Sequence, residues 1–237
     1  MILFHEAQNN RYEMAIHQTI IIILLWMSVF AMSRALSATS VATAPTSAPT
    51  TEPGDSPRQA YERLVVAMQQ GDGQTIRQLI DAPGDERQLV DALVEYAEAL
   101  ARLRQAAVLT YGSAQARGLT GDPADQEKRL EAIRQSQQQI EGDHATLKVN
   151  LPDTPLIRLQ RVDGRWRVPL RAMLADMDPT QITRQMEETT IQVLAFDETT
   201  ADILAGKYHT ADEAAQSLRS RLIRPATVPT TAATRPG

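Results

Sequence analysis

Residues Thr154–Leu170 read TPLIRLQRVDGRWRVPL, and this stretch decides the fold. Asp163-Gly164 separates two runs that are rich in branched and aromatic residues. An Asp-Gly pair between two such runs is the strongest short-range signal for a β-hairpin. The rest of the chain is mostly helical in pattern, so we expect its helices to pack on this sheet.

The two faces of the hairpin follow from the alternation of side chains along a strand. One face is expected to lie on the core, and it carries Ile157, Leu159, Trp166 and Val168. The other face is expected to lie in water, and it carries Arg158, Arg165 and Arg167. The preceding segment Ala145–Val149 alternates in the same way, which predicts a further half-buried strand.

The composition excludes several classes of chemistry. The chain has 237 residues, a net charge of −5 and no cysteine. Disulfides, thiolate metal sites, a cysteine nucleophile and a lipid anchor on cysteine are therefore excluded. No basic block is present, so nucleic-acid binding is not expected. Arginine makes up 21 of the 24 basic residues, which indicates either coding bias or a use in binding anions.

The N-terminal segment 1–38 is expected to be a signal peptide or an N-terminal membrane anchor. Its apolar run of 13 residues, 20–32, is short for a membrane span and suits the hydrophobic part of a signal peptide. Small residues follow, so cleavage is expected between Ser37 and Thr43. Met14 is an alternative start that gives a leader of ordinary length. The chain is thus expected to be extracytoplasmic, periplasmic or secreted, with membrane contact only through this segment.

Two segments rich in Thr, Ala and Pro flank the part of the chain that is expected to fold. They are 39–55, a linker, and 224–237, a tail. Their composition cannot bury a core and favours solvated chain. We therefore expect one domain over 56–223.

The helices are predicted from caps and periodicity. Ser56 and Gln59 form a capping box before the first helix, which Gly71 ends. The longest helix is expected from Asp85 to Tyr111. Its apolar stripe is Leu89, Leu93, Tyr96, Leu100, Leu103 and Ala107. We expect this stripe to pack on the sheet of the same chain, and a coiled-coil partner is the alternative.

The C-terminal part of the chain is predicted to return to helix. Residues 112–126 are expected to be mainly loop. A capping box at Asp178 begins a helix, and the polar residues 197–200 predict a break before its last turn. Thr210 is expected to begin a final helix that ends before Pro225.

The order of elements resembles the nuclear-transport-factor-2-like superfamily, the cystatin-like α+β cone. The motifs that carry the resemblance are RQAYERLVVAMQQGDGQTIRQLI and VDGRWRV, within residues 56–170. The resemblance implies an α+β fold with long N-terminal helices packed on a curved antiparallel sheet. The helical segment 178–223 departs from the plain cone and follows the sheet. Such cones include enzymes and non-catalytic modules of bacterial envelope proteins.

Few residues suggest a reactive site. His144 lies beside Asp143, but neighbours on a strand face opposite sides, which argues against an acid–base pair. His209 lies at a helix start with acidic residues nearby. No hydrolase, zinc-protease or phosphate-loop motif is present. We predict no catalytic residue, no metal and no cofactor. The candidates for lining a pocket are Tyr96, Leu159 and Trp166.

The sequence therefore favours a non-catalytic extracytoplasmic domain that binds a protein partner or a small ligand. A membrane-tethered scaffold that associates through its long helices is the first alternative. A pocket enzyme with acid–base chemistry is the second. An open polar pocket on the core face of the sheet would favour the enzyme, and a large exposed apolar patch would favour the scaffold.

Overall fold

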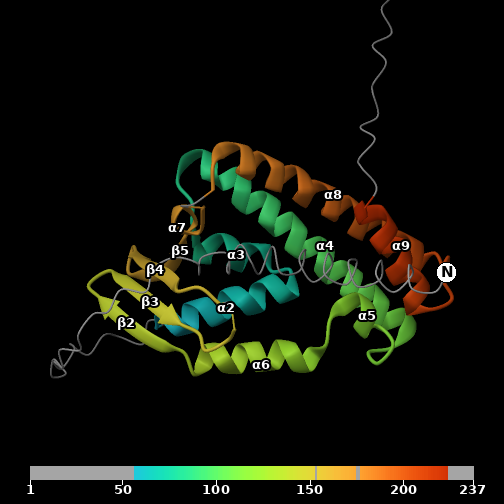
Figure 1. Ribbon diagram of the computed structural model, residues 1–237, viewed down its shortest axis with the longest axis horizontal. Coiled ribbons are helices and arrows are strands. Elements are labelled where there is room, and N and C mark those ends of the chain that lie inside the picture. Colours follow the sequence, from blue (N-terminus) through green and yellow to red (C-terminus); the bar gives the residue numbers. More distant parts are fainter. Residues whose placement is uncertain (1–55, 153, 175–176, 224–237) are drawn as a thin grey trace, which may run out of the picture.

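The predicted hairpin is present in the computed structural model (Figure 1). Strands β4 (Ile157–Val162) and β5 (Arg165–Pro169) pair antiparallel, and Val162 lies opposite Arg165. Asp163 and Gly164 both have positive φ, 50° and 76°. Two successive positive φ angles are typical of the type I′ turn, whose twist matches that of the two strands.

The structure describes residues 56–152, 154–174 and 177–223. The predicted leader, linker and tail lie outside the described residues. The described chain is an α+β structure that is mostly helical, with a five-stranded sheet.

The sheet has the strand order β1-β5-β4-β3-β2, and it is mixed rather than purely antiparallel. Its remaining strands are β1 (Ile80–Asp81), β2 (Gln137–Glu141) and β3 (His144–Lys148). β1 pairs parallel with β5, so the expectation of an antiparallel sheet is wrong at this edge. Two residues are too few to show the alternation that predicts a strand. β1 exists because the preceding helix delivers it beside β5.

Three helices belong to the sheet core. They are α2 (Pro57–Gln70), α3 (Gly73–Leu79) and α6 (Pro123–Arg134). The capping box of Ser56 and Gln59 is confirmed, and Gly71 ends α2 in the left-handed conformation. The residues 112–126 are less irregular than predicted. They contain the short helix α5 (Arg117–Thr120) and the first turn of α6, which Asp122 caps.

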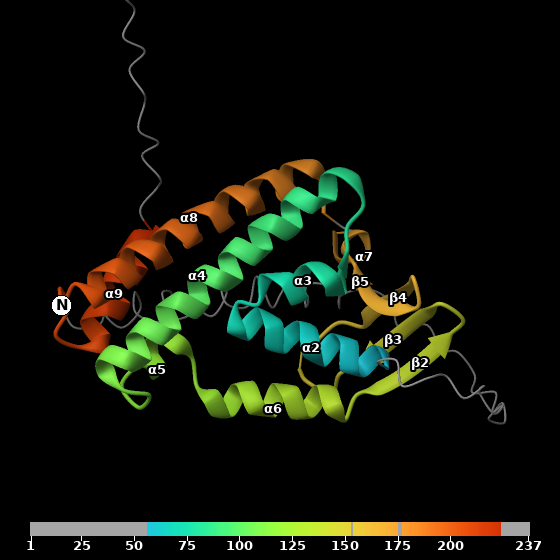
Figure 2. The same ribbon diagram turned by 180° about the vertical axis from the view of Figure 1, so that it is seen from behind.

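Helix α4 (Arg87–Tyr111) connects the sheet core with a second, helical core (Figure 2). It follows the short 3-10 turn η1 (Gly84–Glu86) and packs mainly on α8 (Pro179–Leu204). The expectation that its stripe packs on the sheet is therefore wrong. Alanines of α4 such as Ala99 and Ala106 are buried in the helical core instead.

The two long helices α4 and α8 run in the same direction. Arg102 pairs with Asp197, with Nη2 and Oδ1 2.8 Å apart. At the C-terminal end of α4, the hydroxyl of Tyr111 donates to the carbonyl of Tyr208 at 3.3 Å. Tyr208 lies four residues beyond the end of α8, so later residues of α4 contact later residues of the C-terminal segment. Figures 1 and 2 show the two helices side by side.

Helix α8 is continuous, so the predicted break at 197–200 is wrong. Thr199 is fully buried, and the hydroxyl of Thr200 donates to the carbonyl of Phe196 within the helix at 2.7 Å. These threonines therefore form hydrogen bonds without ending the helix. The capping box of Asp178 and the final helix α9 (Ala211–Ile223) are confirmed. Helix α7 (Leu170–Leu174) follows β5 directly.

No helix among the described residues combines the length and the apolar composition that a membrane span requires.

Candidate functional site

The core face of the sheet is filled with apolar side chains. Leu147, Leu159 and Trp166 are at most 3% exposed, and α2 and α3 contact the strands on this side. The guanidinium carbon of Arg161 lies 4.6 Å from the centre of the Trp166 ring. Where a cone could keep an open pocket, the described residues form a packed core.

The three candidate pocket residues lie in two different cores. Leu159 and Trp166 come together in the sheet core. Tyr96 lies in the helical core at 4% exposure, where its ring meets that of Phe196 edge to face at 5.4 Å. Burial raises the pKa of Tyr96 to about 12.

The outer face of the sheet carries polar side chains in register. His144 lies opposite Gln160, which in turn lies opposite Arg167, and Thr146 lies opposite Arg158. Residues on neighbouring strands that lie directly opposite have their Cβ atoms about 5 Å apart. Side chains from three strands are thereby brought together on one surface.

A shallow depression of about 310 Å³ lies on this outer face where β3 and β4 meet α7. Its lining residues are His144, Ala145, Thr146, Arg158, Leu159, Gln160, Pro169, Arg171 and Ala172. Ala145 and Leu159 have side chains buried on the core side. The polar groups of the depression therefore come from His144, Thr146, Arg158, Gln160 and Arg171.

The cations of the outer face differ in whether they have a partner. Within the described part of the chain, Lys148, Arg158 and Arg165 are exposed and form no ion pair. Arg167 lies 3.7 Å from the carboxylate of Asp163.

Arg171, at the edge of the depression, is held by Glu86, and this contact raises the pKa of its guanidinium. Because Arg167 on β5 and Arg171 on α7 already have carboxylate partners, the unpaired charge over the depression comes chiefly from Arg158.

Neither histidine of the described chain forms an acid–base pair. His144 is exposed, and no described carboxylate makes a hydrogen bond or ion pair with it. At the start of α9, it is the backbone N–H of His209 that contacts Glu213, at 2.8 Å from the carboxylate. Among the described residues, no group of three metal-ligating side chains is present.

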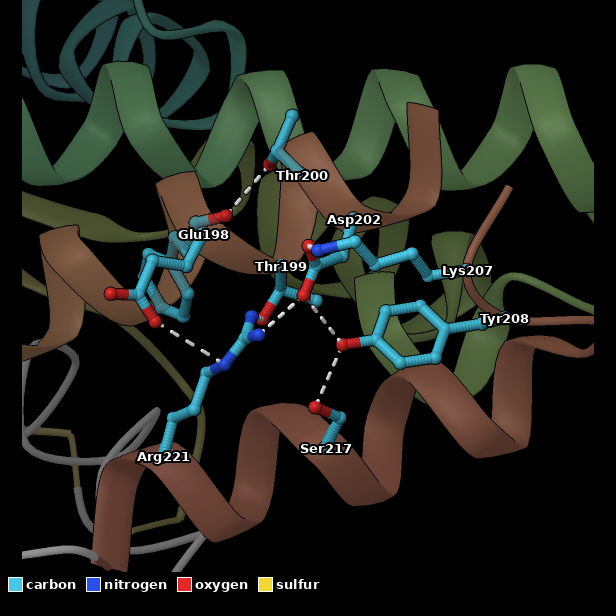
Figure 3. A network of polar contacts seen from close by, with 9 residues as sticks. Glu198, Thr199, Thr200, Asp202, Lys207, Tyr208, Ser217 and Arg221 are labelled. Carbon is cyan, nitrogen blue, oxygen red and sulfur yellow. Dashed lines mark hydrogen bonds and ion pairs between the residues drawn. The ribbon is translucent and has the colours of Figure 1, made fainter. Parts of the chain in front are cut away.

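A second polar cluster joins α8 to α9 (Figure 3). The carboxylate of Asp202 accepts hydrogen bonds from Lys207, Tyr208 and Arg221. The Tyr208 hydroxyl also accepts a hydrogen bond from the hydroxyl of Ser217 on α9, at 2.8 Å. The bonds from Lys207 and Arg221 hold the pKa of Asp202 well below its ordinary value. Each charge in the cluster has a partner, which is the arrangement of a structural latch between two helices.

A second hollow, of about 400 Å³, lies between the end of α2 and α4. Its lining residues are Gln69, Gln70, Gly71, Glu98, Ala101, Arg102 and Gln105. Its one arginine pairs with Asp197, and Glu98 adds a negative charge. It therefore lacks the exposed cations without ion pairs that the outer sheet face presents among the described residues.

Comparison of the chain with family models, with curated proteins and with solved structures gives no match in any of the three. The geometry of the described residues therefore carries the functional argument.

The depression could not be located from the sequence, although part of its signal is there. The alternation correctly places Arg158 and Arg165 on the exposed side of the hairpin. The neighbours of Arg158 depend on the register between β3 and β4 and on the return of α7 to the sheet edge. Neither can be read from a local pattern.

Proposed function

We propose that this chain is a non-catalytic, extracytoplasmic module of the cone type that binds a negatively charged partner or ligand on the outer face of its sheet. Helix α2, the Gly71-Asp72 turn into α3 and the Asp-Gly hairpin support the cone assignment. The extracytoplasmic location rests on the leader predicted over 1–38.

The observation that carries the proposal is the unpaired positive charge of the outer face. Lys148, Arg158 and Arg165 lie exposed there and form no ion pair with any described residue, although the chain as a whole has a net charge of −5. Elsewhere in the described chain, Arg77, Arg134 and Arg221 have carboxylate partners. Arg87 and Arg117 are exposed without an ion pair to a described residue, but they stand singly on α4 and α5. An excess of exposed cations on one face of an acidic protein attracts ligands of the opposite sign.

The packed core face supports the same assignment. Ligand sites are usually concave and keep a few polar groups within an apolar surface. On the core side of this sheet the space is occupied by Leu147, Leu159 and Trp166, which are buried. The outer face is where the described sheet has both exposed polar groups and a hollow.

The test uses a fluorescent peptide of ten glutamates and the full chain. We expect saturable binding that weakens as salt is added, because the attraction between exposed charges is screened. The variant Lys148→Gln/Arg158→Gln/Arg165→Gln should bind at least tenfold more weakly.

The matched control removes three exposed basic residues elsewhere, Arg117→Gln/Lys128→Gln/Arg184→Gln, on α5, α6 and α8. The net charge of the two variants is equal, so a non-specific charge effect would weaken both alike. Equal loss in both variants, or no binding by the unmodified chain, would overturn the proposal. Sedimentation of the same samples checks the alternative of a self-associating scaffold, in which the chain would form oligomers without the peptide.

A further inference from the structure

We propose that the depression on the outer sheet face is a subsite for a single oxyanion group, either a carboxylate or a phosphate, and that Arg158 is its anchoring cation. This inference rests on the proposed function and narrows it, because it names one hollow and one chemical class within the basic face.

The polar side chains that line the depression can all donate a hydrogen bond. Arg158 offers the fork of its guanidinium, Thr146 a hydroxyl and Gln160 an amide, and His144 and Arg171 contribute ring and guanidinium N–H groups. None of the lining residues is acidic. A surface built of donors matches a group that only accepts hydrogen bonds, as carboxylates and phosphates do.

The nearest acidic residues by register stand outside the lining. Glu141 lies opposite His144 on β2, where its carboxylate accepts from the side chain of Gln139 at 2.7 Å. Asp81 lies beside Pro169, on the far side of β5 from Arg158. Glu86 comes nearer, because its carboxylate pairs with the lining Arg171, but it is not itself a lining residue. An incoming anion therefore approaches Arg158 without a carboxylate among the lining groups.

Arg158 is the central group for two reasons. First, Thr146 lies directly opposite Arg158 on β3, and Pro169 belongs to β5, the other neighbouring strand, so lining residues flank Arg158 on both sides. It is also the lining arginine whose charge is free among the described residues, since Arg171 is held by Glu86. An arginine without a carboxylate partner can bind both oxygens of an anion at once.

The size of the hollow limits the ligand to one anionic group with a few attached atoms. A depression of about 310 Å³ is at the lower end of the range for small-molecule sites. The group would be either the terminal carboxylate of a chain or a phosphate monoester, because both are anions that accept two hydrogen bonds from one guanidinium.

The experiment titrates methyl phosphate and acetate, in parallel and at constant ionic strength, into the ¹⁵N-labelled full chain. We expect saturable shifts of the backbone amides of Thr146, Arg158 and Gln160. The ligand with the lower Kd identifies the source, phosphate or carboxylate.

The variants separate a defined subsite from general attraction. Arg158→Gln should raise the Kd at least tenfold, and Arg158→Lys should recover part of the affinity, since it keeps the charge but not the fork. Arg165→Gln is the matched control. It removes an equal charge from the same face but does not line the depression, so its Kd should stay within twofold.

The failure of this inference can be told apart from failure of the proposed function. Suppose that binding of the glutamate peptide still requires the three cations, but neither small anion gives saturable shifts at Thr146 and Gln160. The subsite is then wrong, while the proposed binding of anionic partners to the outer face stands. Equal effects of Arg158→Gln and Arg165→Gln would also overturn the subsite. If the peptide does not bind at all, both proposals fail.

Discussion

The sheet core and the helical core of this molecule differ in the size of their buried side chains. In the sheet core, four of the 22 buried apolar residues are alanine, whereas in the helical core the fraction is eight of 14. Alanine buries little apolar surface, so each helical-core position contributes less to stability. The sheet core instead relies on large side chains such as Leu147, Leu159 and Trp166.

The helical core also buries polar groups that the sheet core mostly avoids. Of the four buried polar residues among those described, Thr189, Gln192 and Thr199 all lie on α8, and Ser136 precedes β2. Alanines allow α4 and α8 to approach closely, and the Asp202 cluster holds α9 in place. The difference indicates that apolar burial stabilises one half of the molecule, while close helix packing and a polar latch hold the other.

The largest expected effect is the loss of the indole from the sheet core. Trp166→Ala should lower the free energy of unfolding by about 3–5 kcal/mol, because a buried aromatic side chain leaves a cavity. Urea unfolding measures the loss. As the control, Arg161→Gln removes the cation above the ring and should cost about 0.5–1 kcal/mol. A loss below about 1 kcal/mol for Trp166→Ala would mean that the core is not built around this side chain.

The next-largest effect concerns Gly71, where the end of α2 lies against α4. At Gly71, φ is +70° and an added Cβ would lie 2.8 Å from the Cβ of Ala101 and 3.0 Å from the Cα of Glu98. Left-handed strain and the clash together should make Gly71→Ala cost about 2–4 kcal/mol.

The matched substitution is Gly164→Ala in the hairpin turn. Its φ of +76° is also left-handed, but nothing lies within 4 Å of an added Cβ. Strain alone should cost about 1–2 kcal/mol there. Equal losses for both glycines in thermal unfolding would show that α2 and α4 do not approach closely at Ala101.

The latch should give a local effect that depends on pH. The pKa of Asp202 is lowered in the folded protein by Lys207 and Arg221, so the carboxylate stabilises the fold above its ordinary pKa of 3.8. This contribution is lost as the pH falls through the lower, folded value. The protection of the α9 amides against exchange, relative to their intrinsic rates, should therefore be lost in acid at a higher pH than that of β3 and β4.

Asp202→Asn should lower the protection of the α9 amides at neutral pH. In this variant, most of the further loss of protection in acid should disappear. Asp197→Asn is the control on the same helix, because its pair with Arg102 is exposed and should contribute little. If α9 exchanges alike in both variants, the polar cluster does not hold the helix.

The smallest effect should have the opposite sign. The side-chain oxygen of Gln192 is buried on α8 and has no hydrogen-bond partner in the described structure. Gln192→Met removes this unsatisfied group at similar volume and should stabilise the protein by about 0.5–1 kcal/mol. Thr199→Val is the contrast, since its hydroxyl accepts from Arg221 at 2.8 Å, and it should destabilise. Urea unfolding measures both variants. If Thr199→Val proved more stable than Gln192→Met, the assignment of Gln192 as unsatisfied and Thr199 as hydrogen-bonded would be contradicted.

Local features were predicted well because they depend on near neighbours in the chain. The Asp163-Gly164 turn follows from the φ angles that these residues tolerate, and the capping boxes at Ser56 and Asp178 follow from side chains that reach their own backbone three residues away. The burial of Leu159 and the exposure of Arg158 follow from alternation along a strand.

The contacts between distant segments could not be predicted in this way. The stripe on α4 is compatible with a strand or a helix as its neighbour, and its pairing with α8 became known only from the structure. The predicted break near 197–200 failed because burial against α4 holds the threonines of α8 in helix.

By itself, the sequence determined the hairpin, the helix caps, the exclusion of cysteine chemistry and the exposure of Arg158 and Arg165, whereas Arg167 on the same face is half-buried. These depend on backbone angles and on periods of two or about four residues, which are local quantities. Only the tertiary structure decided that β1 lies beside β5, that two separate cores share α4, and that Arg158 stands over a hollow among donors. Such features depend on strand register and on the choice between competing packing partners, and both are settled by contacts between residues far apart in the chain.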